Sequence, residues 1–237
     1  MTHRFLTLTV MFFWILSVVP LAVAEEDSLT PYPDPRRFED AIGAFETQDL
    51  AGPPPPGAVL CIGSSSMRFW HDTMADDLQP LTLIRRGFGG STMLDVLFYC
   101  SRVVVPYQPR AILIYEGDND VDGGVSAARF MATFGQFVEV VRATLPETRL
   151  YVLAIKPSPA RWKSWPVMKA ANVLLRQGCA DDPLLEYIDI ASPMLGPDGL
   201  PLPEIYLEDK LHLNRRGYEI WTREVRRVMV AKETAGE

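Results

Sequence analysis

The stretch AVLCIGSSSM, residues 58–67, decides how this chain folds. Its first five residues are apolar without a break, which is typical of a strand buried on both faces of a parallel sheet. Gly63 permits a sharp turn, and serines such as those that follow it commonly begin helices. The stretch therefore predicts a buried strand that leads directly into a helix, the repeating unit of α/β sheets.

The same alternation continues along the rest of the chain. Short apolar runs predict further strands at 81–84, 111–115, 150–155 and 186–190, and helical periodicity is found at about 92–104, 126–141, 163–178 and 215–231. This order predicts a three-layer α/β/α sandwich with a flavodoxin-like parallel sheet of about five strands. In such sheets, ligands bind at the carboxyl ends of the strands.

Size and charge narrow the classes of protein to consider. The chain has 237 residues, enough for one ordinary domain. Its 30 acidic residues outnumber its 23 basic residues, so the net charge is −7. Nucleic acid is not expected as a partner, because phosphate binding needs a basic face. Basic residues near the C-terminus alternate with apolar ones, which is typical of the solvated side of a last helix.

The N-terminus has the features of an export signal. Arg4 precedes an almost unbroken apolar run from Leu6 to Val19, and residues 22–24, AVA, form the small-x-small pattern that signal peptidase recognises. Residues 1–24 are therefore predicted to be a signal peptide, and the mature protein is predicted to be periplasmic or secreted. The run is shorter than the roughly 20 apolar residues of a membrane span, so no stable membrane insertion is expected after cleavage. An uncleaved N-terminal membrane anchor is the alternative.

Residues 25–57 are predicted to form a leader ahead of the domain at 58–237. A helix is expected over 37–48, where apolar residues recur at helical spacing. The glycine- and proline-rich stretch 52–57 breaks regular structure and predicts a stiff connector into the first strand.

Three cysteines follow the predicted signal peptide: Cys61, Cys100 and Cys179. An oxidising compartment permits one disulfide and leaves one thiol over. Cys61 lies in the first predicted strand, where a buried free thiol is expected, and pairing of Cys100 with Cys179 stays open at this point. No Cys/His spacing typical of a zinc site occurs, and we expect neither a metal nor a cofactor.

Polar segments follow the first two predicted strands. In GSSS, residues 63–66, a hydroxyl at a helix start would lie in the positive field of unpaired N–H groups, which assists an attacking oxygen. A serine that only caps the helix is the alternative. In the segment 86–92, adjacent Gly89 and Gly90 let a backbone N–H approach a ligand closely, with an ordinary flexible turn as the alternative.

A third segment, EGDND at 116–120, follows the third predicted strand. Its acids resemble the start of a calcium-binding EF-hand loop. The twelfth position of that loop is however Arg129 rather than glutamate, and a strand rather than a helix precedes the segment, so calcium is not expected. The side-chain amide of Asn119 could instead donate to an anionic oxygen in a strand-end crevice.

A fourth segment, DKLHLN at 209–214, precedes the last predicted helix. Its spacing lets the carboxylate of Asp209 reach the imidazole of His212 and hold the tautomer whose other nitrogen accepts a proton. Of the other two histidines, His3 falls in the predicted signal peptide. His71 falls in the helix after the first strand, where a surface or packing role is expected. His212 is therefore the candidate base.

Together and in this order, the four segments resemble the SGNH (GDSL-like) hydrolase family. The resemblance spans about 58–222, and the residue that departs from it is Ser64, where the family usually has aspartate. The residues that match by position are listed here: Ser65 for the nucleophile, Asp209 and His212 for the base pair, and Ser65, Gly90 and Asn119 for the oxyanion hole, with Met67, Trp70, Gly217 and Tyr218 as further fits.

The resemblance implies a serine ester hydrolase. His212, oriented by Asp209, would take the proton of Ser65 as it attacks an ester carbonyl, and water would then release the acyl group. The α/β-hydrolase class is not indicated, because its G-x-S-x-G pentapeptide does not occur. The alternatives are an exported carbohydrate-binding module or an O-acyltransferase-like member that keeps the scaffold without hydrolysing simple esters.

The expected partner is a small-molecule or glycan ester. Candidate substrate contacts are Trp70 and Trp162, which with Trp165 could offer a platform to a sugar ring, and Arg161, which like Arg68 could meet an acidic group. The alternative is that the tryptophans pack under loops. No insertion offers a lid for long acyl chains, so short acyl groups are expected, with acetylated carbohydrate as one candidate substrate. Oligomeric state stays open.

Overall fold

The computed structural model describes residues 31–235, so the predicted signal peptide lies outside the described residues. Five parallel strands form one sheet in the order β2-β1-β3-β4-β5, which confirms the predicted flavodoxin-like topology. The strands are β1 (Val59–Gly63), β2 (Leu83–Gly87), β3 (Ala111–Tyr115), β4 (Arg149–Leu153) and β5 (Leu185–Ile188).

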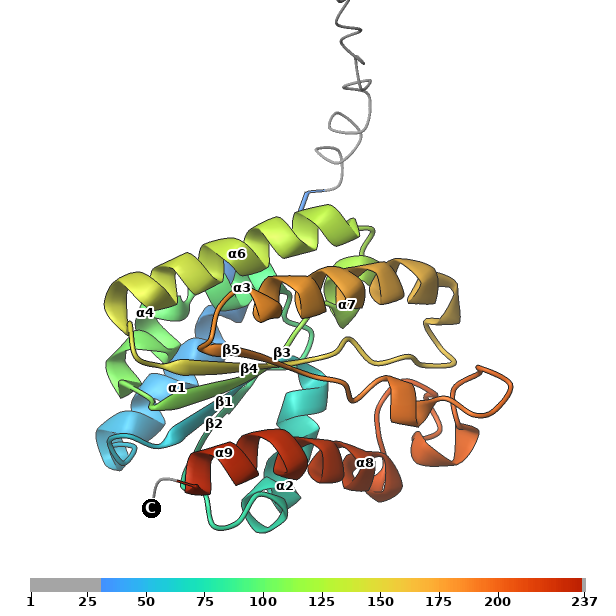
Figure 1. Ribbon diagram of the computed structural model, residues 1–237. Coiled ribbons are helices and arrows are strands. Elements are labelled where there is room, and N and C mark those ends of the chain that lie inside the picture. Colours follow the sequence, from blue (N-terminus) through green and yellow to red (C-terminus); the bar gives the residue numbers. More distant parts are fainter. Residues whose placement is uncertain (1–30, 236–237) are drawn as a thin grey trace, which may run out of the picture.

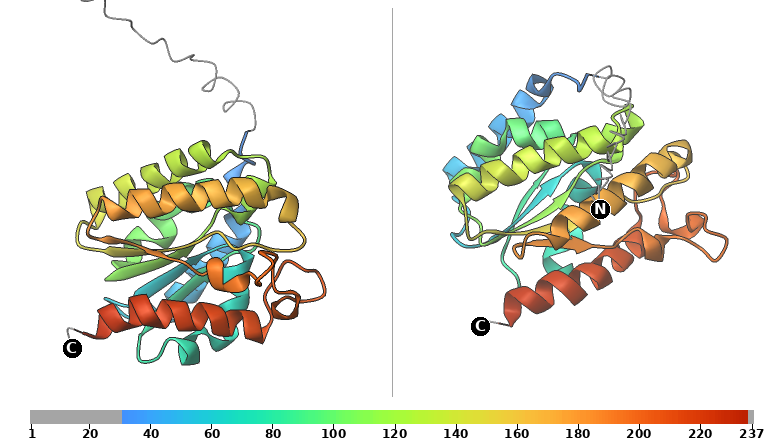
Figure 2. Two further views of the ribbon diagram at one scale, coloured as in Figure 1. Left: turned by 45° about the vertical axis from the view of Figure 1, so that its right-hand side comes forward. Right: turned by 45° about the horizontal axis from the view of Figure 1, so that its top comes forward.

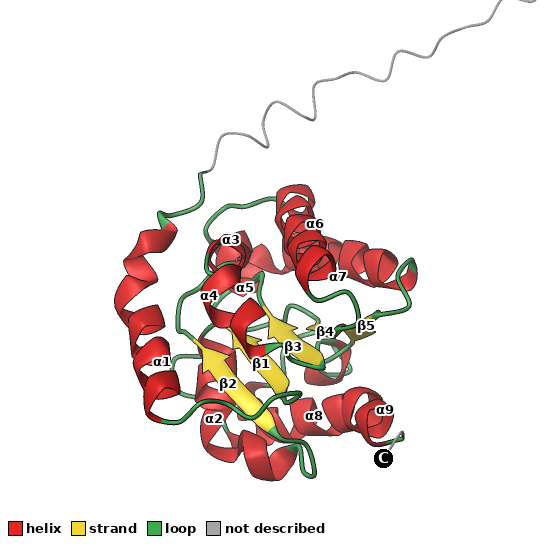
Figure 3. Cartoon of the chain, turned by 90° about the vertical axis from the view of Figure 1, so that its left-hand side faces the viewer, coloured by secondary structure: helices red, strands yellow, loops and turns green. Residues whose placement is uncertain are grey.

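Helices cover both faces of the sheet, and the three layers are visible in Figure 1 and end-on in Figure 3. One face carries α1 (Glu39–Ala51), α3 (Met93–Phe98), α4 (Cys100–Val103), α6 (Ala127–Thr144) and α7 (Trp165–Ala180). The opposite face carries α2 (Ser65–Asp77), α8 (Arg215–Val225) and α9 (Ala231–Thr234), and α8 and α9 appear red in both views of Figure 2. The short helix α5 (Asp118–Asp122) follows β3.

Shorter helical turns complete the described part of the chain. They are the 3-10 turns Pro35–Phe38, Val105–Tyr107, Trp162–Ser164, Ser192–Met194 and Pro203–Ile205, and a π-helical turn at Arg226–Val230 between α8 and α9.

Side chains of β1 alternate between the two faces of the sheet, so this apolar strand contributes to the hydrophobic core on each face. Leu60 and Ile62 pack with α1, α3, α6 and α7, whereas Val59 and Cys61 pack with α2 and α8. All four side chains are completely buried. A strand covered on both faces has no position for a polar residue, which is why the run is unbroken.

The second strand lies later than predicted, at 83–87 rather than 81–84. Its sequence includes Arg85 and Arg86, so an apolar run does not mark it. Because β2 is an edge strand, Arg85 can remain exposed, and Arg86 is buried only because Tyr107 and Asp49 accept its hydrogen bonds. Edge strands tolerate charged residues that central strands exclude.

Two other expectations are refined by the structure. The helix expected at 92–104 is divided at Tyr99 into α3 and α4, and the leader helix is present as α1.

The three cysteines are all free and buried, so Cys100 and Cys179 do not pair. Within residues 31–235, no helix is long and apolar enough to cross a membrane.

A buried carboxylate connects α2 to α8. Asp77, at the end of α2, accepts hydrogen bonds from Trp70 Nε1 at 2.7 Å and from the guanidinium of Arg215 at 2.6 and 2.7 Å. The Asp77 side chain is only 5% exposed. Since Ser65 begins α2 and His212 lies just before α8, this connection fixes the two elements that carry these residues.

We predict that Asp77→Ala lowers the free energy of unfolding by about 2–4 kcal/mol, because it leaves the buried Trp70 N–H without an acceptor and removes the buried carboxylate that pairs with Arg215. The measurement is urea denaturation. Asp76→Ala is the matched control, since Asp76 is exposed and its effect should stay within about 0.5 kcal/mol. Equal urea midpoints for the two variants would contradict the prediction.

Candidate active site

Ser65 is placed by the turn that follows β1. Gly63 has φ +142°, and a Cβ at this position would lie 2.1 Å from the carbonyl oxygen of Tyr115 on the neighbouring strand β3. Only glycine allows this approach of the two backbones. The chain then enters α2 with Ser65 as its first residue, so the Ser65 N–H has no acceptor within the helix.

His212 and Asp209 lie on a tight loop before α8. The loop is closed by the hydrogen bond from Leu207 N to the carbonyl of His212 at 2.8 Å. Asn214 then begins α8, because its side chain accepts from the backbone N–H groups of Arg216 and Gly217. His212 therefore lies just before α8 and faces Ser65 at the start of α2.

Three side chains form one hydrogen-bonded row. His212 Nε2 lies 2.9 Å from Ser65 Oγ, and His212 Nδ1 lies 2.6 Å from Asp209 Oδ2. Asp209 Oδ1 also accepts from the backbone N–H groups of Leu211 and His212, both at 2.9 Å. The structure thus brings together the serine, histidine and aspartate singled out in the sequence, in the order that a serine nucleophile and its base require.

The hydrogen bonds also set the ionisation of Asp209. Partial desolvation would raise the pKa of Asp209, but hydrogen bonds from the His212 ring and from the two backbone N–H groups outweigh it and hold the pKa at about 2. This ionised carboxylate stabilises the loop at pH values above the ordinary pKa of an aspartate. That contribution is lost as the pH falls through about 2.

Two loops beside Ser65 carry candidate donors to an oxyanion. In the first, Gly90 has φ +86°, and the loop is attached to β1 by the hydrogen bond from Phe88 N to the Gly63 carbonyl at 2.8 Å. In the second, Asn119 Nδ2 donates one hydrogen to the carbonyl of Ser91 at 2.8 Å, which leaves its other N–H for a ligand. The two loops are therefore joined through Ser91.

Hydrogen bonds to two buried acidic residues, Glu116 and Asp120, fix the positions of these loops. Ser91 Oγ donates to Glu116 Oε1 at 2.5 Å, and Asp120 accepts from the backbone N–H groups of Met93 and Gly117 at 2.9 and 3.1 Å. Burial, and after it the negative field of Asp120, raises the pKa of Glu116 well above its ordinary value. Burial also raises the pKa of Asp120 to about 6. Glu116 therefore keeps its proton to a higher pH than an exposed glutamate does.

Arg161 belongs to an internal ion-pair network. Its guanidinium lies 2.7 Å from Asp118 Oδ1 and 3.0 Å from Asp122 Oδ2, and the completely buried ammonium of Lys156 also pairs with Asp118. Its charge is thus already matched by carboxylates of α5, and a contact between Arg161 and an acidic substrate stays a prediction. In the described range 31–235, no group of His, Cys, Asp and Glu side chains is arranged to hold a metal ion.

The predicted tryptophan contacts have different outcomes. Trp70 is completely buried, donates to Asp77 and stacks on Tyr218, so the prediction that it contacts substrate is wrong. Trp162 is half-buried and lies nearly parallel to Trp165, with ring centroids 6.0 Å apart. The turn before them touches the aspartate–histidine loop, where Ala160 N donates to the Lys210 carbonyl at 3.1 Å.

Three residues beside the candidate row were not predicted from the sequence: Phe69, Ser91 and Glu116. Phe69 is 40% exposed and packs edge-to-face on the His212 ring, with centroids 4.7 Å apart. Its position four residues after Ser65, on the same side of the predicted helix, is a signal that could have found it. His71 has the expected packing role: its Nε2 accepts from Gly87 N at 3.2 Å.

A parallel sheet that presents a serine, a histidine and an aspartate as one hydrogen-bonded row at its carboxyl ends has the arrangement found in serine hydrolases. A family model described as the GDSL-like lipase/acylhydrolase family matches residues 52–220. The chain belongs to this family and is a hydrolase that acts on ester bonds.

Solved structures agree with this fold. A GDSL-like lipase from Bacteroides thetaiotaomicron superposes with a TM-score of 0.71 at 19% identity, covering 81% of this chain and 98% of that chain. An acetylxylan esterase from Geobacillus stearothermophilus superposes with a TM-score of 0.62 at 14% identity, covering 73% of this chain and 94% of that chain. These identities show the fold alone. No curated protein sequence matches the chain.

We predict that the raised pKa of Glu116 makes the fold less stable at alkaline pH. A carboxyl with a raised folded-state pKa binds more protons folded than unfolded. The stability it confers is therefore complete below the unfolded pKa of about 4.3 and is lost as the pH rises through the folded pKa. Glu116→Gln mimics the neutral acid, so its urea midpoints at pH 6 and pH 9 should differ less than those of the wild type.

Two further variants calibrate this measurement. Glu116→Ala should lose about 2–4 kcal/mol at both pH values, because it leaves a cavity and an unpaired Ser91 hydroxyl. The exposed Glu147→Gln should keep the wild-type pH dependence. The same pH dependence in Glu116→Gln as in the wild type would contradict a raised pKa of Glu116.

Proposed function

We propose that this ester hydrolase acts through Ser65 as nucleophile, with His212 as base and Asp209 as the group that orients it. The observation that carries this proposal is the continuous row of hydrogen bonds, 2.9 Å from Ser65 Oγ to His212 Nε2 and 2.6 Å from His212 Nδ1 to Asp209. With Nδ1–H donating to the carboxylate, Nε2 is the nitrogen free to accept the serine proton.

The proposed reaction has two halves. Ser65 Oγ attacks the ester carbonyl as its proton passes to His212 Nε2, and His212 then gives that proton to the departing alcohol. Water, deprotonated by the same nitrogen, attacks the acyl-serine and releases the carboxylic acid. Asp209 remains ionised throughout, because its pKa is about 2, and it stabilises the imidazolium formed in each half.

The oxyanion formed in each attack is proposed to lie among the backbone N–H groups of Ser65 and Gly90 and the amide of Asn119. The Ser65 N–H is unpaired in α2, and Asn119 has one N–H left after its bond to the Ser91 carbonyl. One such donor typically contributes about 3–4 kcal/mol to lowering the barrier.

For the substrate, we propose short-acyl esters, with acetylated carbohydrate as the leading candidate. The half-buried Trp162–Trp165 pair supports this, because parallel aromatic rings next to the aspartate–histidine loop offer an apolar face to a sugar. One structural neighbour is itself an acetylxylan esterase.

We also propose that the protein is exported, on the basis of the signal-like residues 1–24. The N-terminal sequence of the protein recovered from cells, beginning at Glu25 or at Met1, tests this.

The first test is hydrolysis of p-nitrophenyl acetate by residues 25–237. We predict that Ser65→Ala lowers kcat by about 10⁴-fold or more, because the nucleophile is lost. Ser66→Ala is the matched control and should keep activity within a few-fold of wild type. Loss of activity in Ser66→Ala, with activity retained in Ser65→Ala, would show that the nucleophile is Ser66 and would contradict the proposal. If the wild type and Ser65→Ala are equally inert towards esters, the carbohydrate-binding or acyltransferase alternative is favoured.

Acyl-chain length gives a separate prediction. We expect kcat/KM to fall from acetate to butyrate to octanoate esters of p-nitrophenol, because no insertion within residues 31–235 offers a lid for a long acyl chain. The three esters share one leaving group, so the comparison reports on the acyl part alone. Equal or rising kcat/KM towards octanoate would contradict the short-acyl assignment.

Asp209→Asn tests the orienting role. We expect kcat to fall on the order of 10³–10⁴-fold, because an amide oxygen supports the His212 tautomer and the imidazolium less well than a carboxylate. Asp198→Asn, in an exposed turn, should leave kcat unchanged. A small, equal effect of the two substitutions would remove Asp209 from the mechanism.

A further inference from the structure

Arg68 is an exposed cation one turn after Ser65 in α2. Other arginines near the site are matched by acids: Arg86 by Asp49, Arg161 by Asp118, and Arg215 by Asp77. Within residues 31–235, Arg68 forms no ion pair with a carboxylate, and its guanidinium lies over the ring of Phe69, 4.7 Å from the centroid. Its charge is therefore available to a ligand.

Arg68 and Ser65 both lie next to Gly89, in the loop that carries Gly90. A Cβ on Gly89 would lie 3.6 Å from Ser65 Cβ and 3.3 Å from Arg68 Nε. A substrate atom bound in front of Gly89 would thus have the nucleophile on one side and the cation on the other. Phe69, which Arg68 covers, in turn contacts the His212 ring.

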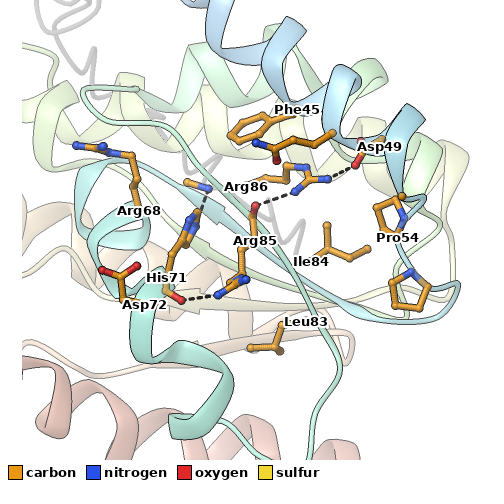
Figure 4. Close-up of a pocket in the computed structure, with 14 residues that line it drawn as sticks. Phe45, Asp49, Pro54, Arg68, His71, Asp72, Leu83, Ile84, Arg85 and Arg86 are labelled. Atoms are coloured by element: carbon orange, nitrogen blue, oxygen red, sulfur yellow. Dashed lines mark hydrogen bonds and ion pairs between the residues drawn. The ribbon is translucent and has the colours of Figure 1, made fainter.

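A groove extends from Arg68 along the exposed edge of β2. It has a volume of about 520 Å³ and runs between α2 and the end of α1 with its proline connector (Figure 4). An acetyl group would fill only a small part of this volume, whereas a sugar-sized group fits it. The groove therefore suits the alcohol part of an ester rather than a short acyl part.

The charges of the groove favour an anion. Arg85 also lines it, and in residues 31–235 no carboxylate pairs with this arginine, whose Nη1 donates to the backbone carbonyl of His71. Of the two acids in the wall, Asp49 is bound by Arg86 and Tyr107, so Asp72 is the acid left to oppose the arginines. Desolvation, and after it the positive field of Arg85 and Arg86, lowers the pKa of His71 to about 4. His71 is neutral at pH 7.

We propose that Arg68, supported by Arg85, binds an anionic group on the alcohol part of the ester, such as the carboxylate of an acidic sugar. The inference rests on the proposed function, because it places this anion relative to Ser65 as nucleophile. The anion takes no part in bond breaking. It holds the substrate so that the ester lies in front of Gly89, and it is recognised although the protein as a whole carries a net charge of −7.

The experiment compares two acetate esters that differ in one charge, 4-acetoxyphenylacetate and its primary amide. The ratio of their kcat/KM values is measured for each variant, so that effects on the chemical step cancel. We expect Arg68→Gln to lower the carboxylate-to-amide ratio about 2- to 5-fold, mainly through KM, with Arg68→Lys keeping most of it. Asp72→Asn should raise the ratio, because it removes the opposing charge.

Controls separate this inference from the proposed function. Arg216→Gln removes an exposed charge on α8, outside the groove, and should leave the ratio unchanged. Hydrolysis of both esters with a ratio that Arg68→Gln does not change would overturn the inference alone. No hydrolysis of either ester or of p-nitrophenyl acetate by the wild type would overturn the proposed function as well.

A third ester tests which part of the substrate carries the anion. Mono-4-nitrophenyl succinate has its carboxylate on the acyl side. If Arg68→Gln affects the kcat/KM of this ester more than that of 4-acetoxyphenylacetate, the anion binds on the acyl side, and the assignment of the groove to the alcohol part is overturned.

Discussion

The hydrogen bond between His212 and Ser65 joins residues that are 147 positions apart in the chain, and much of the structure serves to keep these two residues together. Ser65 is fixed because β1 and β3 approach so closely at Gly63 that the chain can only turn into α2. His212 is fixed because its loop closes on itself and leads into α8. The remaining freedom, movement of α2 against α8, is removed by Asp77, which accepts hydrogen bonds from Trp70 and Arg215.

The opposite side of the candidate site is organised by buried acids rather than by apolar packing. Ser91 is central, because its carbonyl orients the Asn119 amide and its hydroxyl bonds to Glu116. Burial beside other acids raises the pKa of Glu116, which makes this part of the fold sensitive to pH. Such a polar network is more directional than apolar side chains, and donors to an oxyanion need defined directions.

Charge is distributed unevenly around the site. On the side of β4 and α5, Lys156 and Arg161 are paired with Asp118 and Asp122, so this side offers no net cation to a ligand. On the side of β2, Arg68 and Arg85 have no carboxylate partner among the described residues. An acidic protein can therefore present a locally positive groove, since the field near a site depends on the nearest unpaired charges more than on the net charge.

The sequence by itself determined the α/β class, the central strands and the residues of the candidate row. Central strands are covered on both faces, so their apolar runs are visible without knowledge of any partner. The spacing of Asp209 and His212 is also a local property, readable within one loop. What only the tertiary structure decided is which side chains share a long-range contact. The edge strand β2 carries two arginines because Arg85 is exposed to solvent and the buried Arg86 bonds to Asp49 and Tyr107. Trp70 is buried because it packs against Tyr218 and Trp221 of α8, and Arg161 is neutralised because Asp118 pairs with it. Arg68 remains free because no described acid does. Such pairings depend on how separate elements pack, and no local pattern of residues encodes them.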